Sequence, residues 1–263
     1  MWWRSTVATT VSDGGRDPDR YRAAQRGLTR LLVREVRGLR RLIIPSRLRQ
    51  SMPDWFTAVQ TVVDQYAQTS AALGAEFYDA QREAAGVPGS FTVPVVDPPP
   101  PEKAEASLRW AAKDVWERDP EQATPAQREP LEVRLGQAEK KAELVAQKLV
   151  ADTGRSTVLE AVRQDPQARA WARSAALGAC AFCKLLASRG SVFARETVGF
   201  RAHDGCHCGA IPVFAGQRFE PSPQAREWAR LYEEYAAGHS GSQLARFRRA
   251  LAEHDPNPLP GAF

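Results

Sequence analysis

The chain has 263 residues, is 43% hydrophobic, and carries a formal net charge of +5 with an isoelectric point near 9.2. This mild basicity permits contact with nucleic acid or an acidic partner without requiring either. No apolar run approaches the roughly 20 residues that a membrane span needs, and the start of the chain lacks the apolar core of a signal peptide. We therefore expect a soluble protein made in a reducing cytosol, with no membrane partner.

An arginine-rich segment runs from Asp19 to Gln50, and a helix is predicted in it because apolar residues recur at helical spacing. The apolar positions are Leu28, Leu31, Leu32, Leu39, Leu42 and Ile43. The same stretch holds ten arginines against two acids. Such one-sided charge predicts either an arm that contacts DNA or an acidic surface of a larger assembly, or a solvated helix face. The candidate nucleic-acid-binding residues are Arg30, Arg34, Arg37, Arg40 and Arg41.

Pro45 is expected to end this helix and Pro53 to open a second one, over Asp54 to Ala85, that packs against the first as an antiparallel pair. Residues 86–101 follow, with four consecutive prolines that favour extended polyproline II. They predict a linker and a domain boundary after a basic helical region, 1–85. A long ordered loop crossing a single domain is the alternative.

Helical signals resume at Glu102, and an amphipathic run from Pro130 to Asp152 is predicted to be interrupted at Gly154 and to end at Asp165-Pro166. None of these segments contains a phosphate-binding loop, a nucleophile elbow or a zinc-protease motif. We therefore expect no catalytic residues, no enzyme activity and no small-molecule substrate.

All four cysteines lie in one stretch, as Cys180-x-x-Cys183 and Cys206-x-Cys208, with His203 and His207 beside the second pair. Thiolate and imidazole are the ligands that Zn²⁺ prefers, and a structural zinc takes four of them. The spacing favours the four cysteines as ligands, with His203 as the reserve. Free buried thiols or two disulfides are the alternatives, and disulfides would need an oxidising compartment.

The region after the cysteines changes character. Residues 210–214 predict a strand, which could pair with 192–193 and 198–200, and two helices should follow over 221–253. This gives a region 102–219 that contains the cysteine module (core 176–214), and a region 220–263 with C-terminal helices and a flexible tail. The expected fold is mainly α: helical N-terminal and central regions with a small metal-stapled α+β module near the C-terminus.

The run CAFCKLLASRGSVF, followed by HDGCHCGAIPVF, resembles the heart of the MuF-like minor head proteins of tailed phages, and is closest in character to actinobacteriophage versions. The preceding ADTGRSTVLEAVRQDPQARAWARSAALGAC is similar to that family too. The resemblance implies a minor capsid protein of the virion, made in the host cytoplasm. It would lie in the capsid interior near the portal, with the portal, the major capsid protein and packaged DNA as partners.

The competing hypothesis is a zinc-containing enzyme that acts on nucleic acid. Cysteine pairs staple some HNH-type nucleases, and His203-Asp204 would then supply the catalytic histidine. The number of donors favours a closed structural site instead, because a catalytic zinc keeps one position open for water.

Overall fold

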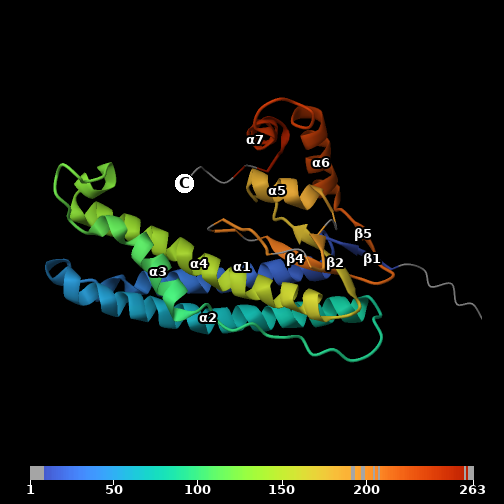
Figure 1. Cartoon of the computed structure of the whole chain (residues 1–263), viewed down its shortest axis with the longest axis horizontal. Coiled ribbons are helices and arrows are strands. Elements are labelled where there is room, and N and C mark those ends of the chain that lie inside the picture. Colours follow the sequence, from blue (N-terminus) through green and yellow to red (C-terminus); the bar gives the residue numbers. More distant parts are fainter. Residues whose placement is uncertain are drawn as a thin grey trace, which may run out of the picture.

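Three long helices form the body of the molecule: α1 (Arg16–Gly38), α2 (Leu48–Ala84) and α4 (Leu131–Gln164) lie side by side, and the shorter α3 (Pro101–Ala111) packs against α2 and α4 (Figure 1). This computed structural model describes residues 9–190, 193–196, 199–203, 205–206, 208–257 and 259. With 37 residues, α2 is about 55 Å long. The mainly α fold class is confirmed. No helix within the described residues is both long and apolar enough to cross a membrane.

The connection between α1 and α2 differs from the prediction. Helix α1 ends at Gly38, and two 3₁₀ turns, η1 (Leu39–Leu42) and η2 (Pro45–Arg47), lead into α2. The hydroxyl of Ser51 accepts the N–H of Ile44 at 3.0 Å and fixes this corner, so Pro53 lies inside α2 rather than at its start. The predicted apolar stripe was also wrong at Leu31, which is 47% exposed, because Leu32 and Val36 face the core instead.

Residues 86–101 connect two parts of the bundle that share one core. Leu108 of α3 is buried in the same core as Leu32 of α1 and Trp55 of α2, so the helices before and after the segment share one interior. The segment itself is held against the bundle, since Val93 is buried and the N–H of Val96 donates to the Thr157 hydroxyl at 3.3 Å. Extended proline-rich chain can lie along a helical surface as well as span open space, and composition alone does not distinguish the two.

Gly154 does not interrupt α4, which is continuous from Leu131 to Gln164. It lies instead where α2 and α4 come closest. A Cβ at Gly154 would be 2.5 Å from the hydroxyl oxygen and 2.7 Å from the carbonyl oxygen of Ser70, and a Cβ at Gly74 would be 2.7 Å from the carbonyl oxygen of Gly154. The glycines allow the two backbones to approach.

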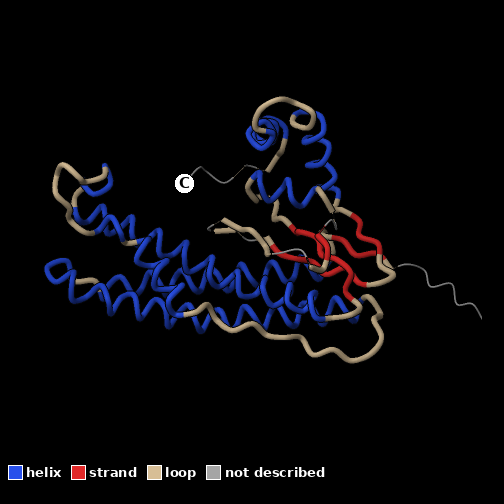
Figure 2. Tube along the Cα trace, viewed as in Figure 1, coloured by secondary structure: helices blue, strands red, loops and turns tan. Residues whose placement is uncertain are grey.

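A three-stranded antiparallel sheet covers one end of the bundle (Figure 2), in the order β3 (Phe193–Ala194), β2 (Ala168–Ser174), β4 (Gly209–Phe214). The strand expected over 210–214 is present as β4, but β3 pairs with β2 and not with it. Residues 192 and 198 lie outside the described residues, and Phe200 packs on Trp171 without joining the sheet. A second, parallel pair joins β1 (Thr10–Ser12) to β5 (Arg218–Glu220).

The C-terminal helices belong to the cysteine module. Helices α5 (Ala181–Ser188), α6 (Pro223–Tyr235) and α7 (Gln243–His254) form a layer on the far side of the sheet from the bundle (Figure 1). Trp228 of α6 and Phe247 of α7 are buried in one cluster with Cys183. The core of the cysteine module therefore includes residues of α6 and α7, beyond residue 219. Two further 3₁₀ turns, η3 (Lys113–Val115) and η4 (Pro125–Arg128), connect α3 to α4.

Candidate metal centre

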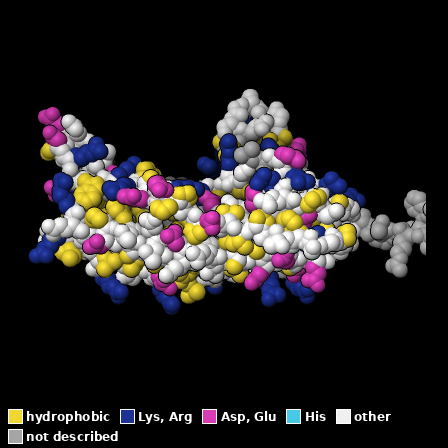
Figure 3. Space-filling model, turned by 60° about the horizontal axis from the view of Figure 1, so that its bottom comes forward, with side chains coloured by type: hydrophobic (Ala, Val, Ile, Leu, Met, Phe, Trp, Pro, Cys, Tyr) yellow, Lys and Arg dark blue, Asp and Glu magenta, His cyan; other side chains and the backbone are white. Residues whose placement is uncertain are grey.

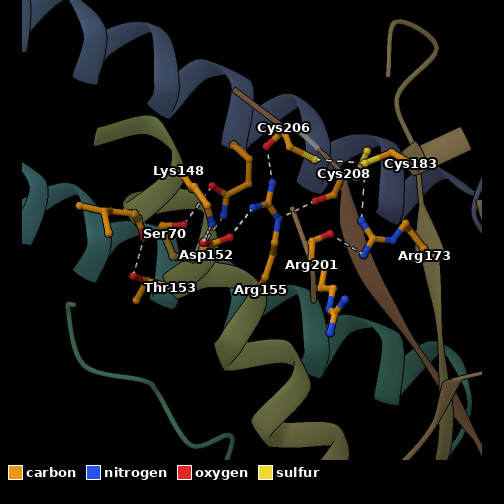
Figure 4. A network of polar contacts seen from close by, with 12 residues as sticks. Ser70, Lys148, Asp152, Thr153, Arg155, Arg173, Cys183, Arg201, Cys206 and Cys208 are labelled. Carbon is orange, nitrogen blue, oxygen red and sulfur yellow. Dashed lines mark hydrogen bonds and ion pairs between the residues drawn. The ribbon is translucent and has the colours of Figure 1, made fainter. Parts of the chain in front are cut away.

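The fold brings the two cysteine pairs together. Cys180 is the N-cap residue of α5 and Cys183 lies in its first turn, while Cys206 and Cys208 lie in the segment that leads into β4. All four are free thiols, so the disulfide alternative is excluded within this structure. Because α5 and β4 both pack on β2, residues separated by more than twenty positions in the sequence share one site (Figure 4).

Two triads of donor atoms meet at Cys183. Its sulfur lies with those of Cys206 and Cys208 in one group, and with the donors of Cys180 and His203 in another, and the donor atoms of each group are within 4.8 Å of one another. The Sγ atoms of Cys183 and Cys206 are 3.6 Å apart. Tetrahedral zinc with Zn–S bonds of about 2.3 Å places its sulfurs about 3.8 Å apart, so this spacing and donor chemistry fit Zn²⁺.

Burial separates the candidate ligands into two kinds. Cys183, Cys206 and Cys208 are buried, whereas Cys180 is half-buried and His203 is exposed. A zinc held by the buried triad would take its fourth ligand from the outer side, from Cys180 or from His203. Both are placed beside Cys183, and the sequence-based choice between them stays a prediction. His207 lies outside the described residues.

The thiols also perturb one another. A hydrogen bond from the Cys183 thiol, aided by the nearby His203, lowers the pKa of Cys180 to about 5. Hydrogen bonds from Cys183 and Cys208 lower the pKa of Cys206 well below its ordinary value. The pKa of Cys183 rises in turn, because its proton is shared with Cys180 and Cys206. A hydrogen bond with Cys183 would lower the pKa of Cys208, but hydrogen bonding with Cys206 and burial outweigh it and raise that pKa to about 12. Two thiols of lowered pKa, Cys180 and Cys206, therefore lie beside two of raised pKa.

Arg155 of α4, which sequence reasoning did not single out, holds the second cysteine pair. Its Nε donates to the carbonyl oxygen of Cys208 at 2.7 Å and its Nη2 to that of Cys206, while its Nη1 pairs with Asp152 at 2.7 Å (Figure 4). The side chain is 4% exposed. This guanidinium ties the ligand loop to the bundle and supplies a buried positive charge next to the thiolates.

Arg173 of β2 is the second cation at the site, and it too was missed. Its Nη1 donates to the Cys183 sulfur at 3.6 Å and its Nη2 to the carbonyl oxygen of Arg201 at 2.9 Å, and its guanidinium lies 3.6 Å from the centre of the Phe200 ring. Its Nε is buried and lacks a hydrogen-bond partner among the described residues. Zinc with four thiolates carries a net charge of about −2, which two buried arginines would offset. Both arginines are in the segment quoted for the resemblance, but nothing in its pattern marks them as partners of cysteine.

A buried ion pair links the cysteine helix to the end of α7. The ammonium of Lys184 lies 2.7 Å from the carboxylate of Asp255, and both side chains are fully buried. The indole Nε1 of Trp228 donates to the same carboxylate at 2.8 Å. The network fixes α5, and hence Cys183, against α6 and α7.

The five predicted nucleic-acid-binding arginines divide into two groups. Arg37 makes two hydrogen bonds to Glu143 of α4, at 3.0 and 3.1 Å, and Arg40 lies 3.2 Å from Glu132. These two bind the bundle together. The other three are exposed and have no ion-pair partner among the described residues: Arg30, Arg34 and Arg41.

The surface of the bundle carries both basic and acidic side chains. Lys and Arg side chains project along its rim, with Asp and Glu between them (Figure 3). This distribution reduces the local excess of positive charge expected from the sequence of residues 19–50 alone, because α4 supplies part of the missing acid.

The fold and the site define a mainly α protein in which a long helical bundle carries a cysteine-rich candidate metal centre. The chain belongs to the VG15 protein family, whose family model matches residues 14–235, and it is therefore a phage protein. The matched range contains the bundle, the sheet, all four cysteines and α6. Neither a curated protein nor a solved structure matches the chain.

Proposed function

We propose that this protein is a structural minor capsid protein of a tailed phage, which joins the head near the portal and aids head assembly or DNA packaging. The observation that carries the proposal is the family match over residues 14–235, which covers the bundle and the cysteine module together. The resemblance of the cysteine segment to MuF-like minor head proteins supplies the finer role.

The candidate metal centre supports a structural role for zinc. Five donors form the site, Cys183 and four around it; three of the thiols are buried, and Arg155 and Arg173 bring positive charge to it. A donor set that exceeds the four ligands of a structural zinc leaves no position reserved for a reacting water. We infer that the ion would staple α5 to the segment before β4.

The proposed work of the protein is to position other components. Helices as long as α2 and α4 offer extended faces to a shell or portal, and the exposed Arg30, Arg34 and Arg41 on one side could meet an acidic surface or packaged DNA. The stapled module, held to the bundle by Arg155, would keep a second binding face at a fixed distance from the first.

Deletion of the gene in the phage, with complementation from a plasmid, tests this function. We expect heads that assemble but package or retain DNA poorly, and mass spectrometry should find the protein in wild-type virions and proheads. Absence of the protein from both kinds of particle would refute the proposal.

The same complementation experiment also tests the enzyme hypothesis. The variant His203→Ala, checked for folding and incorporation, should restore normal particles if this histidine is a structural ligand or a spare one. A stable, incorporated variant that abolishes infectivity, together with metal-dependent cleavage of DNA by the purified wild-type protein, would establish a nuclease instead.

A further inference from the structure

Helix α4 divides its charges between two sides. Its acids Glu143 and Glu139 face α1 and η1, where they meet Arg37 and Arg40. Its lysines Lys141 and Lys148 lie on the other side, toward α3. The side of α4 beside α3 therefore carries two lysines, with one acid, Asp152, beside them.

A groove runs between α3 and α4 on this side, with a volume of about 440 Å³. We call it the Trp110 groove. It is lined by Lys103, Ala106, Ser107 and Trp110 of α3 and by Val145, Lys148, Leu149 and Asp152 of α4. Val145 and Leu149 lie at its base, where 6% and 5% of their surface is exposed, and Lys103 and Lys148 line its sides.

Trp110 makes the groove unusual. Its side chain is 50% exposed, although burial of an indole is among the most favourable contributions of any side chain. The ammonium groups of Lys113 and Lys141 lie 5.4 and 6.0 Å from its ring centre. A half-exposed indole ring with two cations close to it is the kind of anchor that dominates binding at protein interfaces.

The charges around the groove are not balanced within the chain. Lys103 and Lys148 line it, and Lys113 and Lys141 lie near Trp110. Of the nearby carboxylates, Asp114 pairs with Lys141 and Asp152 is shared between Lys148 and Arg155, while Glu160 and Glu196 lie in the adjoining hollow. Lys103 and Lys113 have no ion-pair partner among the described residues. A ligand that brings carboxylates to the rim would complete these pairs.

A second hollow of about 480 Å³ continues the groove toward Phe200 and shares Lys103 and Asp152 with it. From Val145 to Leu159, the two hollows follow α4 for about 20 Å, at 1.5 Å of rise for each residue. This is the length of about four helical turns of a bound helix. The second hollow adds Leu159, Trp171 and Phe200 as apolar lining, together with charged residues such as Arg155 and Glu160.

We propose that the Trp110 groove binds an acidic amphipathic helix of another head protein, with its apolar stripe on Val145, Leu149 and Trp110 and its carboxylates at the lysine rim. The identity of the partner rests on the proposed function, which makes the portal protein and the major capsid protein the proteins to test. Duplex DNA fits the groove less well, because its bases are stacked inside the helix and phosphates would leave the apolar lining uncovered.

Titration of the purified full-length protein against purified portal protein and major capsid protein tests the proposal. Truncation of an anchor residue should be costly, so Trp110→Ala should weaken binding at least about tenfold. Lys103→Glu should weaken it as well and reduce its dependence on salt, because the charge at the rim is reversed. Leu177→Ala is the matched control: Leu177 is 54% exposed but lies outside the groove, and its variant should bind within about twofold of wild type.

A cross-linking experiment in infected cells supplies an independent readout. A photoreactive benzoylphenylalanine replaces Trp110 or, as the control, Leu177, and cross-linked products from proheads are identified by mass spectrometry. We expect position 110 to cross-link to an acidic helical segment of a head protein and position 177 not to do so.

The outcomes separate this proposal from the proposed function. If the wild-type protein binds a head protein and both groove variants bind equally well, the groove proposal is wrong and the head role stands. If the groove variants lose only self-association or only affinity for duplex DNA, the occupant is a second copy or a nucleic acid, and the proposal is again wrong. Absence of the protein from virions and proheads would overturn both.

Discussion

Replacement of Gly154 by alanine should destabilise the protein, although alanine is the better helix former. Intrinsic propensity favours alanine by about 1 kcal/mol within a helix. Against this gain, the new Cβ would lie 2.5 Å from the hydroxyl oxygen and 2.7 Å from the carbonyl oxygen of Ser70. Forcing two packed helices apart costs about 1–3 kcal/mol.

The new Cβ would also disturb the hydrogen bonds between Ser70 and Gln25. The hydroxyl of Ser70 donates to Gln25 at 3.1 Å, and the amide of Gln25 donates to the carbonyl of Ser70 at 3.3 Å. Disturbing these two bonds between α1 and α2 adds about 1 kcal/mol each. We therefore expect a net loss of about 2 kcal/mol for Gly154→Ala.

Gly136→Ala is the matched control, because Gly136 lies in the same helix and a Cβ there would have no neighbour within 4 Å. It should stabilise the protein by up to about 1 kcal/mol. The two alanine variants should then differ by about 3 kcal/mol, or about 6–12 °C in Tm for a chain of this size.

Thermal and urea unfolding, followed by circular dichroism, measures both variants. Adding Ser70→Ala to Gly154→Ala should recover only part of the loss, because the carbonyl oxygen of residue 70 still blocks the Cβ. A Gly154→Ala variant at least as stable as wild type would show that α2 and α4 are not in close contact at this point.

Three further predictions concern the metal centre, the exposed arginines and the buried ion pair. Elemental analysis should find about one zinc for each chain, and Cys183→Ser should release it and lower Tm; a metal-free wild-type protein of equal stability would contradict this. Arg30→Gln should weaken duplex DNA binding and reduce its salt slope by about 0.9, whereas Arg37→Gln, whose arginine already pairs with Glu143, should change the slope less; equal slopes would leave Arg30 as a solvated residue. Burial would raise the pKa of Asp255, but hydrogen bonds, chiefly from Lys184, outweigh it and lower that pKa. Its contribution is thus present above the unfolded carboxyl pKa of about 3.9 and lost as pH falls through the folded value. Asp255→Asn should cost about 3–5 kcal/mol at neutral pH and flatten the acid side of the stability profile.

The local sequence pattern determined much of the secondary structure of this protein. The helical periodicity of residues 54–85 and the apolar run at 210–214 depend on neighbours in the sequence, and both segments form the elements expected of them. The cysteine spacing also sufficed to select the candidate ligands. Two sulfurs three residues apart at the start of a helix can converge locally, as can two that flank a single residue, but the packing of α5 and β4 on β2 brings the two pairs together.

The strand β2 (Ala168–Ser174) shows where local pattern fails. Its sequence, ARAWARS, has no clear alternation, and its last four residues are all buried, because it is the central strand with a partner on each side and helices over the sheet. Its identity as a strand depends on β3 and β4, which arrive more than twenty residues later. The register Ala172 to Ile211 then places Arg173 against the cysteines.

Only the tertiary structure shows which polar residues contact the site and what role the glycine within α4 has. Arg155, Lys184 and Asp255 are ordinary charged residues in the sequence, and they become important because folding removes them from water beside one another. Glycine has a low helix propensity, but Gly154 lies within α4 and allows α2 to pack closely against it at Ser70. The sequence determined which segments are helical and which residues could bind a metal, because these depend on neighbours along the chain. The charges that surround the metal centre, the single core on both sides of the prolines and the Trp110 groove depend on contacts between distant residues, which only the folded chain creates.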